Sequence, residues 1–175
     1  MGGPHVFMTI ARAIAQTAAG IWLGAIVMMA IVAPTTFSVM RTVEVDRPNT
    51  IAGKVMAKNF SRFDRVQIAC ASVIAMWQIA SLLRGRRATR DKVRMGIILV
   101  AAGLMLYSAT VMTPKIANMQ ADIAAPDAEA AVKAAFDAFH ATAVRIAQAV
   151  MVLVLILNIE MAMQQRDRRL PEESK

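Results

Sequence analysis

The chain has few of the residues from which enzymes usually build a catalytic site. Its single cysteine, Cys70, excludes an intrachain disulfide and, inside an apolar run, is typical of a small packing residue. There are only two histidines, His5 and His140. The sequence has no Gly-rich phosphate loop, no HExxH or CxxC motif, and no pair of carboxylates within an apolar run. It therefore carries no signature of phosphoryl transfer, zinc-dependent hydrolysis or dithiol chemistry.

Charge is also scarce, and most of it lies between four long apolar runs. Hydrophobic residues make up 57% of the chain and the mean hydropathy is +0.49. The runs cover residues 13–37, 66–83, 95–113 and 141–163. A bilayer core about 30 Å thick needs about 20 apolar helical residues to cross it, so each run with its flanks is long enough. The sequence predicts an all-α integral membrane four-helix bundle, with residues 1–175 forming one domain.

The distribution of Lys and Arg predicts the orientation in the membrane. Segment 84–94 has six basic residues in eleven positions, whereas segment 41–65 spreads six over 25 positions and mixes them with three acidic residues. We therefore expect segment 84–94 and both termini in the cytoplasm and segment 122–133 outside, in a bacterial inner membrane. The net charge of +8 then reflects topology and contact with anionic lipid, and nothing indicates a nucleic-acid partner.

Two helical extensions are expected on the outer face. From Thr50 to Arg65 an apolar stripe and a basic stripe both recur at helical spacing, so an amphipathic helix that starts near Pro48 leads into the second span. A helix from Asp127 to Met163 would be roughly 55 Å long, and about a third of it would project beyond the bilayer core. We expect the two extensions to pack together, and the alternative is that both lie flat on the lipid.

Within the bilayer, two spacings indicate packing surfaces. Gln67 and Gln78 are eleven residues, or three turns, apart and share a face with Ala71, so that face should point into the bundle. Gly20 and Gly24 form a GxxxG spacing on the first span, which suits either packing inside the chain or a homo-oligomer.

The residues that stand out chemically converge on the outer ends of the spans. The candidate pocket there comprises Pro34, Phe37, Phe60, Phe63, Asp64, Gln67, Pro114, Phe136, Phe139, His140 and Arg145. Arg145 is its sharpest feature, because charges inside a membrane usually face the protein interior, and we expect it to pair with Asp64 or Gln67. The alternatives are an interfacial aromatic belt in which prolines end the helices, and an arginine that extends to the headgroups.

A metal or haem site is a weaker possibility at the same level. Met112, Met119 and His140 offer thioether and imidazole ligands that suit Cu(I), although methionine is also an ordinary residue of apolar helices. A haem held by two histidines would need His5 and His140, which the topology places at opposite ends. The sequence leaves the cofactor unknown.

Several short motifs resemble those of the transmembrane protein 205 family. They are Gly20-x-Trp22-x-Gly24, Ala33-Pro34 with Phe37, Ala52-Gly53 before Phe60 and Phe63, Thr113-Pro114, Phe136-x-x-Phe139-His140, and Asn158. The resemblance runs from about residue 20 to residue 158, and Ala143 departs from it where the family has a small hydroxyl residue. It implies a four-helix membrane domain, distantly similar to copper-resistance D membrane proteins, with suggested roles in tolerance of metals or drugs and no established activity.

Three classes of function remain open on the sequence. The first is a non-enzymatic bundle that binds or moves a small solute or metal ion through a site at the outer helix ends. The second is a membrane redox or haem-related enzyme. The third is a structural or assembly partner of another membrane protein that acts through Gly20 and Gly24.

Overall fold

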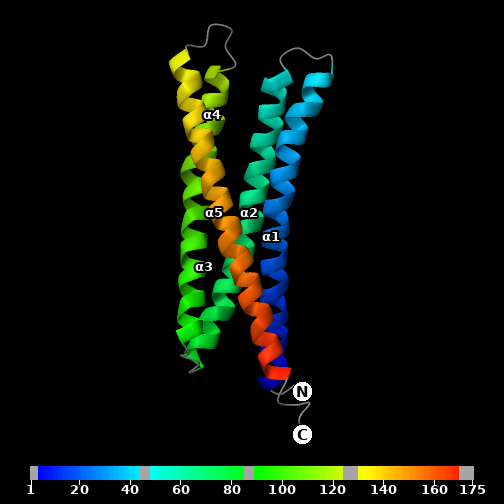
Figure 1. The fold of residues 1–175 in the computed structure, drawn as a ribbon, viewed down its shortest axis with the longest axis vertical. Helices are drawn as coiled ribbons and strands as arrows, with labels where there is room; N and C mark the ends of the chain where they lie inside the picture. Colours follow the sequence, from blue (N-terminus) through cyan, green and yellow to red (C-terminus); the bar gives the residue numbers. More distant parts are fainter. Residues whose placement is uncertain (1–3, 44–47, 85–88, 124–129, 170–175) are drawn as a thin grey trace.

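The computed structural model describes residues 4–43, 48–84, 89–123 and 130–169, in which the backbone forms four long helical rods (Figure 1). The rods are α1, Pro4–Thr42; α2, Pro48–Leu83; a third rod made of α3, Thr89–Tyr107, the π-helical turn η1, Ser108–Met112, and α4, Thr113–Ile123; and α5, Ala130–Arg169. Each rod is long and apolar enough to cross a membrane. The predicted all-α membrane bundle is therefore confirmed, and the composition is that of an integral membrane protein.

Both chain termini lie at one end of the bundle, which we call the termini end, and the opposite end is the distal end (Figure 1). Around the bundle, α1 contacts α2 and α5, and α3 also contacts α2 and α5. Toward the distal end, α4 packs against both α2 and α5. In the same region the α1–α2 pair leans away from the α4–α5 pair (Figure 1).

Pro34 lies inside α1 and does not end it, contrary to the expectation for a belt of helix-ending prolines. A proline lacks the N–H that would bond to the carbonyl four residues earlier. Next to it, the hydroxyls of Thr35 and Thr36 donate to the carbonyls of Ile31 and Val32, each at 2.8 Å. The carbonyl that loses its partner at Pro34 is that of Ala30, and α1 nevertheless continues past it to Thr42.

Pro114 does not end the third rod either. It is the second residue of α4 and follows the π-helical turn η1 by two positions. The preceding turn is π-helical, and the N–H of Thr113 bonds to the carbonyl of Ser108, five residues earlier. The rod therefore continues to Ile123.

The predicted packing of the two helical extensions on each other is wrong, because the third rod continues as α4 between the start of α2 and the start of α5. The start of α2 at Pro48 is confirmed, whereas Asp127 lies outside the described residues. The two extensions do not pack directly on each other in the described structure, because α4 packs against both.

The core draws large apolar side chains from all four rods. Trp22, Ile74, Ile98 and Leu157 are each at most 1% exposed. The outward surface is equally apolar, with Met28 64% exposed, and it suits contact with lipid. Because apolar residues line both faces of each rod, buried polar side chains are the better guide to a functional site.

Candidate functional site

Buried polar side chains are concentrated on one face of α2. Asp64, Gln67, Gln78 and Ser81 are 8%, 6%, 0% and 2% exposed. They are separated by three, eleven and three residues, so they share a face with Ala71, which is also buried. This face points into the bundle, as the spacing of Gln67 and Gln78 predicted.

The first of two polar groups on this face, which we call the distal site, consists of Asp64, Gln67 and Thr113. The Asp64 carboxyl interacts with the hydroxyl side chain of Thr113 at the start of α4. Trp22 Nε1 on α1 donates to Gln67 Oε1 at 2.9 Å. The distal site thus joins three rods through neutral donors and one carboxyl.

The π-helical turn positions Thr113 in the distal site. A π turn holds one residue more than an α turn, so it rotates the residues after it by about 100° relative to a regular helix. Thr113 follows η1 directly and meets Asp64 on α2. Isolated π turns are frequent at functional sites, so the combination of η1 with a buried carboxyl marks this level.

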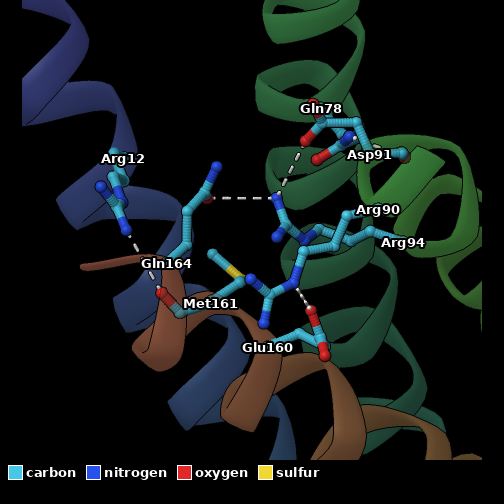
Figure 2. Close-up of polar contacts among 8 residues, drawn as sticks. All are labelled: Arg12, Gln78, Arg90, Asp91, Arg94, Glu160, Met161 and Gln164. Atoms are coloured by element: carbon cyan, nitrogen blue, oxygen red, sulfur yellow. Dashed lines mark hydrogen bonds and ion pairs between the residues drawn. The ribbon is translucent and has the colours of Figure 1, made fainter. Parts of the chain in front are cut away.

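The second polar group, which we call the termini-end cluster, joins the rods at the opposite end (Figure 2). Its members are Arg12, Trp77, Gln78, Arg90, Asp91, Arg94, Glu160 and Gln164. Arg94 is 1% exposed and contacts Asp91 Oδ1 at 3.4 Å and Gln164 Oε1 at 3.2 Å. Arg90 Nε pairs with Glu160 Oε2 at 2.9 Å. The sequence had predicted a functional site only at the distal end.

The residues of the predicted pocket occupy different environments. Asp64 and Gln67 are buried; Phe37, Phe60, Phe63, Phe136 and Phe139 are half-buried; Pro34, Pro114, His140 and Arg145 are exposed. On α5, the Phe136 and His140 rings stack at 5.9 Å, and Lys115 Nζ of α4 lies 3.9 Å from the Phe139 ring. These contacts join α4 to α5, whereas Asp64 and Gln67 lie on α2.

A comparison with known protein families gives one match. Residues 17–125 match the model of a family described as Domain of unknown function (DUF4149), which is more than half of the chain. The chain belongs to this family. No curated protein and no solved structure matches it. The DUF4149 match contains the whole distal site and most of α1, but it stops before α5, and the resemblance to transmembrane protein 205 stays a prediction.

The prediction for Arg145 is wrong in this DUF4149 chain. Its side chain is exposed, and the two expected partners contact other residues: Asp64 interacts with Thr113, and Gln67 accepts from Trp22. The physical reason is again α4, which occupies the position between α2 and α5. The arginine that the bundle does bury is Arg94, at the other end.

The predicted metal ligands differ in their exposure. Met112 is buried, Met119 is half-buried and His140 is exposed. Within the described ranges, no group of three or more His, Cys, Asp or Glu side chains could hold a metal ion. His5 belongs to the first turn of α1 and His140 to the first third of α5, so the backbone places these two positions toward opposite ends of the bundle.

One feature of the sequence could have predicted the termini-end cluster. Glu160 is an acidic residue inside the fourth apolar run, and such residues usually pair with another charge. With four spans, this part of the run lies at the same end as segment 84–94, so its partner could have been sought among Arg90 and Arg94.

An outward groove of about 490 Å³ lies between α1 and α2, away from both polar groups. Ile14, Ala69 and Cys70 are among the side chains that line it. Its apolar lining suits lipid chains better than a polar solute.

Proposed function

We propose that this DUF4149 protein is a non-enzymatic membrane protein that binds, or moves, a small solute or ion through the distal site. The observation that carries the proposal is the buried Asp64 carboxyl, which faces the side chain of Thr113 directly after the π-helical turn. A polar residue inside a membrane bundle is costly to keep, so it marks a solute or ion pathway by default.

The chemistry of the distal site favours a small cation. Asp64 is the acidic side chain there, and the hydroxyl of Thr113 and the amide oxygen of Gln67 add neutral oxygen atoms. Oxygen ligands of this kind suit hard cations. The neighbouring Met112 supplies the thioether that a soft ion such as Cu(I) would use. We place the termini end in the cytoplasm, supported by the basic segment 84–94, and the distal site toward the outside.

The two tryptophans allow a direct test, because each reports on one polar group. Trp22 bonds to Gln67 in the distal site, and Trp77 lies in the termini-end cluster. In a Trp77→Phe protein in lipid nanodiscs, Trp22 fluorescence is measured during titration with Na⁺, K⁺ and Ag⁺, the last as a stable substitute for Cu(I). Choline is the ionic-strength control.

We expect a saturable fluorescence change with one of these cations. Asp64→Asn should abolish it, whereas Asp137→Asn, which removes an exposed carboxyl from the distal part of α5, should preserve it. If no cation gives a saturable signal, or if both variants behave alike, the distal site is not a cation site.

One observation supports an assembly role as a second candidate. Gly20 and Gly24 are exposed, and a Cβ placed on either would meet no other atom within 4 Å. Their spacing would allow close approach of another membrane helix. Glycine to leucine substitutions that change the molecular mass in detergent would support this role, and an unchanged monomer would refute it.

A further inference from the structure

Polar contacts at the termini end tie all four rods together. Arg90 and Arg94 on α3 reach Glu160 and Gln164 on α5 (Figure 2). Gln78 Nε2 on α2 donates to the Asp91 carbonyl on α3 at 3.1 Å.

The first rod joins this end through a backbone contact. Arg12 Nη2 on α1 donates to the Met161 carbonyl on α5 at 3.3 Å (Figure 2). Every rod therefore has at least one polar contact with another rod at this end.

Two contacts of Arg94 in the cluster are longer than a usual charge-assisted hydrogen bond. Charge-assisted hydrogen bonds are usually about 2.7–2.9 Å long, whereas Arg94 lies 3.4 Å from Asp91 and 3.2 Å from Gln164. The desolvation of a buried ion pair also offsets much of its attraction. Apolar side chains at these positions would stabilise the closed end of the bundle about as well as these charged and polar ones.

Two buried groups in the cluster have unmet hydrogen bonds. Trp77 Nε1 and Gln78 Oε1 have no hydrogen-bond partner among the described residues. Such groups destabilise the arrangement that buries them, because both would be hydrogen-bonded in water. Opening this end of the bundle would let water reach both groups, and their hydration would offset part of the free-energy cost of separating the rods.

The middle of the bundle separates the cluster from the distal site. Gln67 and Gln78 are about 16 Å apart along α2. Ala71 and Ile74 on α2, with Ile98 on α3 and Leu157 on α5, are buried apolar residues of the core. At the distal end the two helix pairs lean apart, whereas the termini end is tied across all four rods (Figure 1).

We infer that the termini-end cluster is a gate, which opens this end of the bundle when the contacts of α3 with α5 separate. The gate rests on the proposed function, since it is the end through which a solute from the distal site would leave. The contact that breaks when the gate opens is the Arg90–Glu160 pair. Its side chains are 45% and 25% exposed, so water can compete for their hydrogen bonds. The buried part of the gate is Arg94, with the Trp77 ring 5.9 Å from the guanidinium carbon.

Trp77 fluorescence can test the gate without any solute. In a Trp22→Phe protein, Trp77 is the only tryptophan left, and its quenching by iodide in nanodiscs measures the access of water-soluble ions to the cluster. Glu160→Gln weakens the Arg90 pair without placing a charge in the core. Because exposed ion pairs contribute little to stability, we expect quenching to rise by about two- to fivefold.

Two controls separate gating from general loosening. Lys92→Gln removes an exposed charge from the same turn of α3 and should leave quenching unchanged. The double exchange Arg90→Glu with Glu160→Arg should return quenching toward the parent value. In a Trp77→Phe protein, Glu160→Gln should not change the quenching of Trp22.

The gate is refuted if Glu160→Gln leaves Trp77 quenching unchanged, or if Trp22 quenching rises equally. If Glu160→Gln and Arg90→Gln both prevent folding, the pair is a structural tie and the gate is again refuted. A lack of cation effects on Trp22 would refute the distal cation site but would leave these quenching results unaffected, so the two proposals fail separately.

Discussion

Removing one partner of the buried Arg94–Asp91 pair should destabilise the protein more than removing both. The two side chains are only 1% and 8% exposed. Arg94→Met leaves the Asp91 carboxylate in the bundle without its cation, and breaking a buried pair from one side costs about 3–5 kcal/mol. For a chain of this size that corresponds to a fall of roughly 6–20 °C in the unfolding midpoint.

The double variant Arg94→Met with Asp91→Leu removes both charges together. It forfeits a carboxylate in the first turn of α3, worth about 0.3–1 kcal/mol at a helix N-terminus, but it also removes the desolvation of both ions. The Asp91 carbonyl that accepts from Gln78 is unaffected. We therefore expect the double variant to recover most of the lost stability.

Thermal unfolding in detergent, followed by circular dichroism, measures both effects. Lys92→Met is the matched control, because Lys92 is exposed on the same helix and its replacement should change stability by less than about 0.5 kcal/mol. A double variant as unstable as Arg94→Met would mean that the pair is net stabilising. A single variant as stable as the control would mean that Arg94 is not buried.

Three further predictions follow from exposed positions. In a Cys70→Ser background, a membrane-impermeant thiol reagent should label Ala131→Cys but not Thr89→Cys on intact cells, and the reverse result would invert the proposed orientation. Arg145→Ala and Arg145→Lys should each change the unfolding midpoint by no more than an ordinary surface substitution, whereas a large loss with alanine alone would restore Arg145 as an interior residue. Gly24→Leu should leave monomer stability unchanged, since nothing lies within 4 Å of its Cβ position, and a large loss would show that this face packs inside the chain.

The four-helix membrane bundle could be predicted, because a run of apolar residues long enough to span a bilayer can be recognised from the local sequence alone. Apolar runs of sufficient length must form helices in a bilayer, where backbone groups have no other hydrogen-bond partners. The inward face of α2 was also predictable, since Gln67 and Gln78 recur at a whole number of turns. The spans and the inward face of α2 can each be predicted from the sequence of a single helix.

Features that depend on contacts between helices could not be predicted in the same way. Pro34 and Pro114 suggested helix ends, yet α1 continues past Pro34, and the third rod continues through a π-helical turn past Pro114. The extra length of α4 then separated α2 from α5 and left Arg145 without its expected partners. The predicted pocket was therefore wrong chiefly because the third span was expected to end at Pro114.

The buried polar residues of α2 constrain function more than the apolar core does. A bundle selected only for stability could carry leucine or isoleucine at positions 64, 67 and 78, since apolar residues pack the core elsewhere along the same face. Asp64 and Gln78 instead hold polar groups at two levels with an apolar layer between them. That arrangement suits a protein that admits water or ions to each end separately, because the apolar layer prevents the two polar levels from being hydrated through one continuous path.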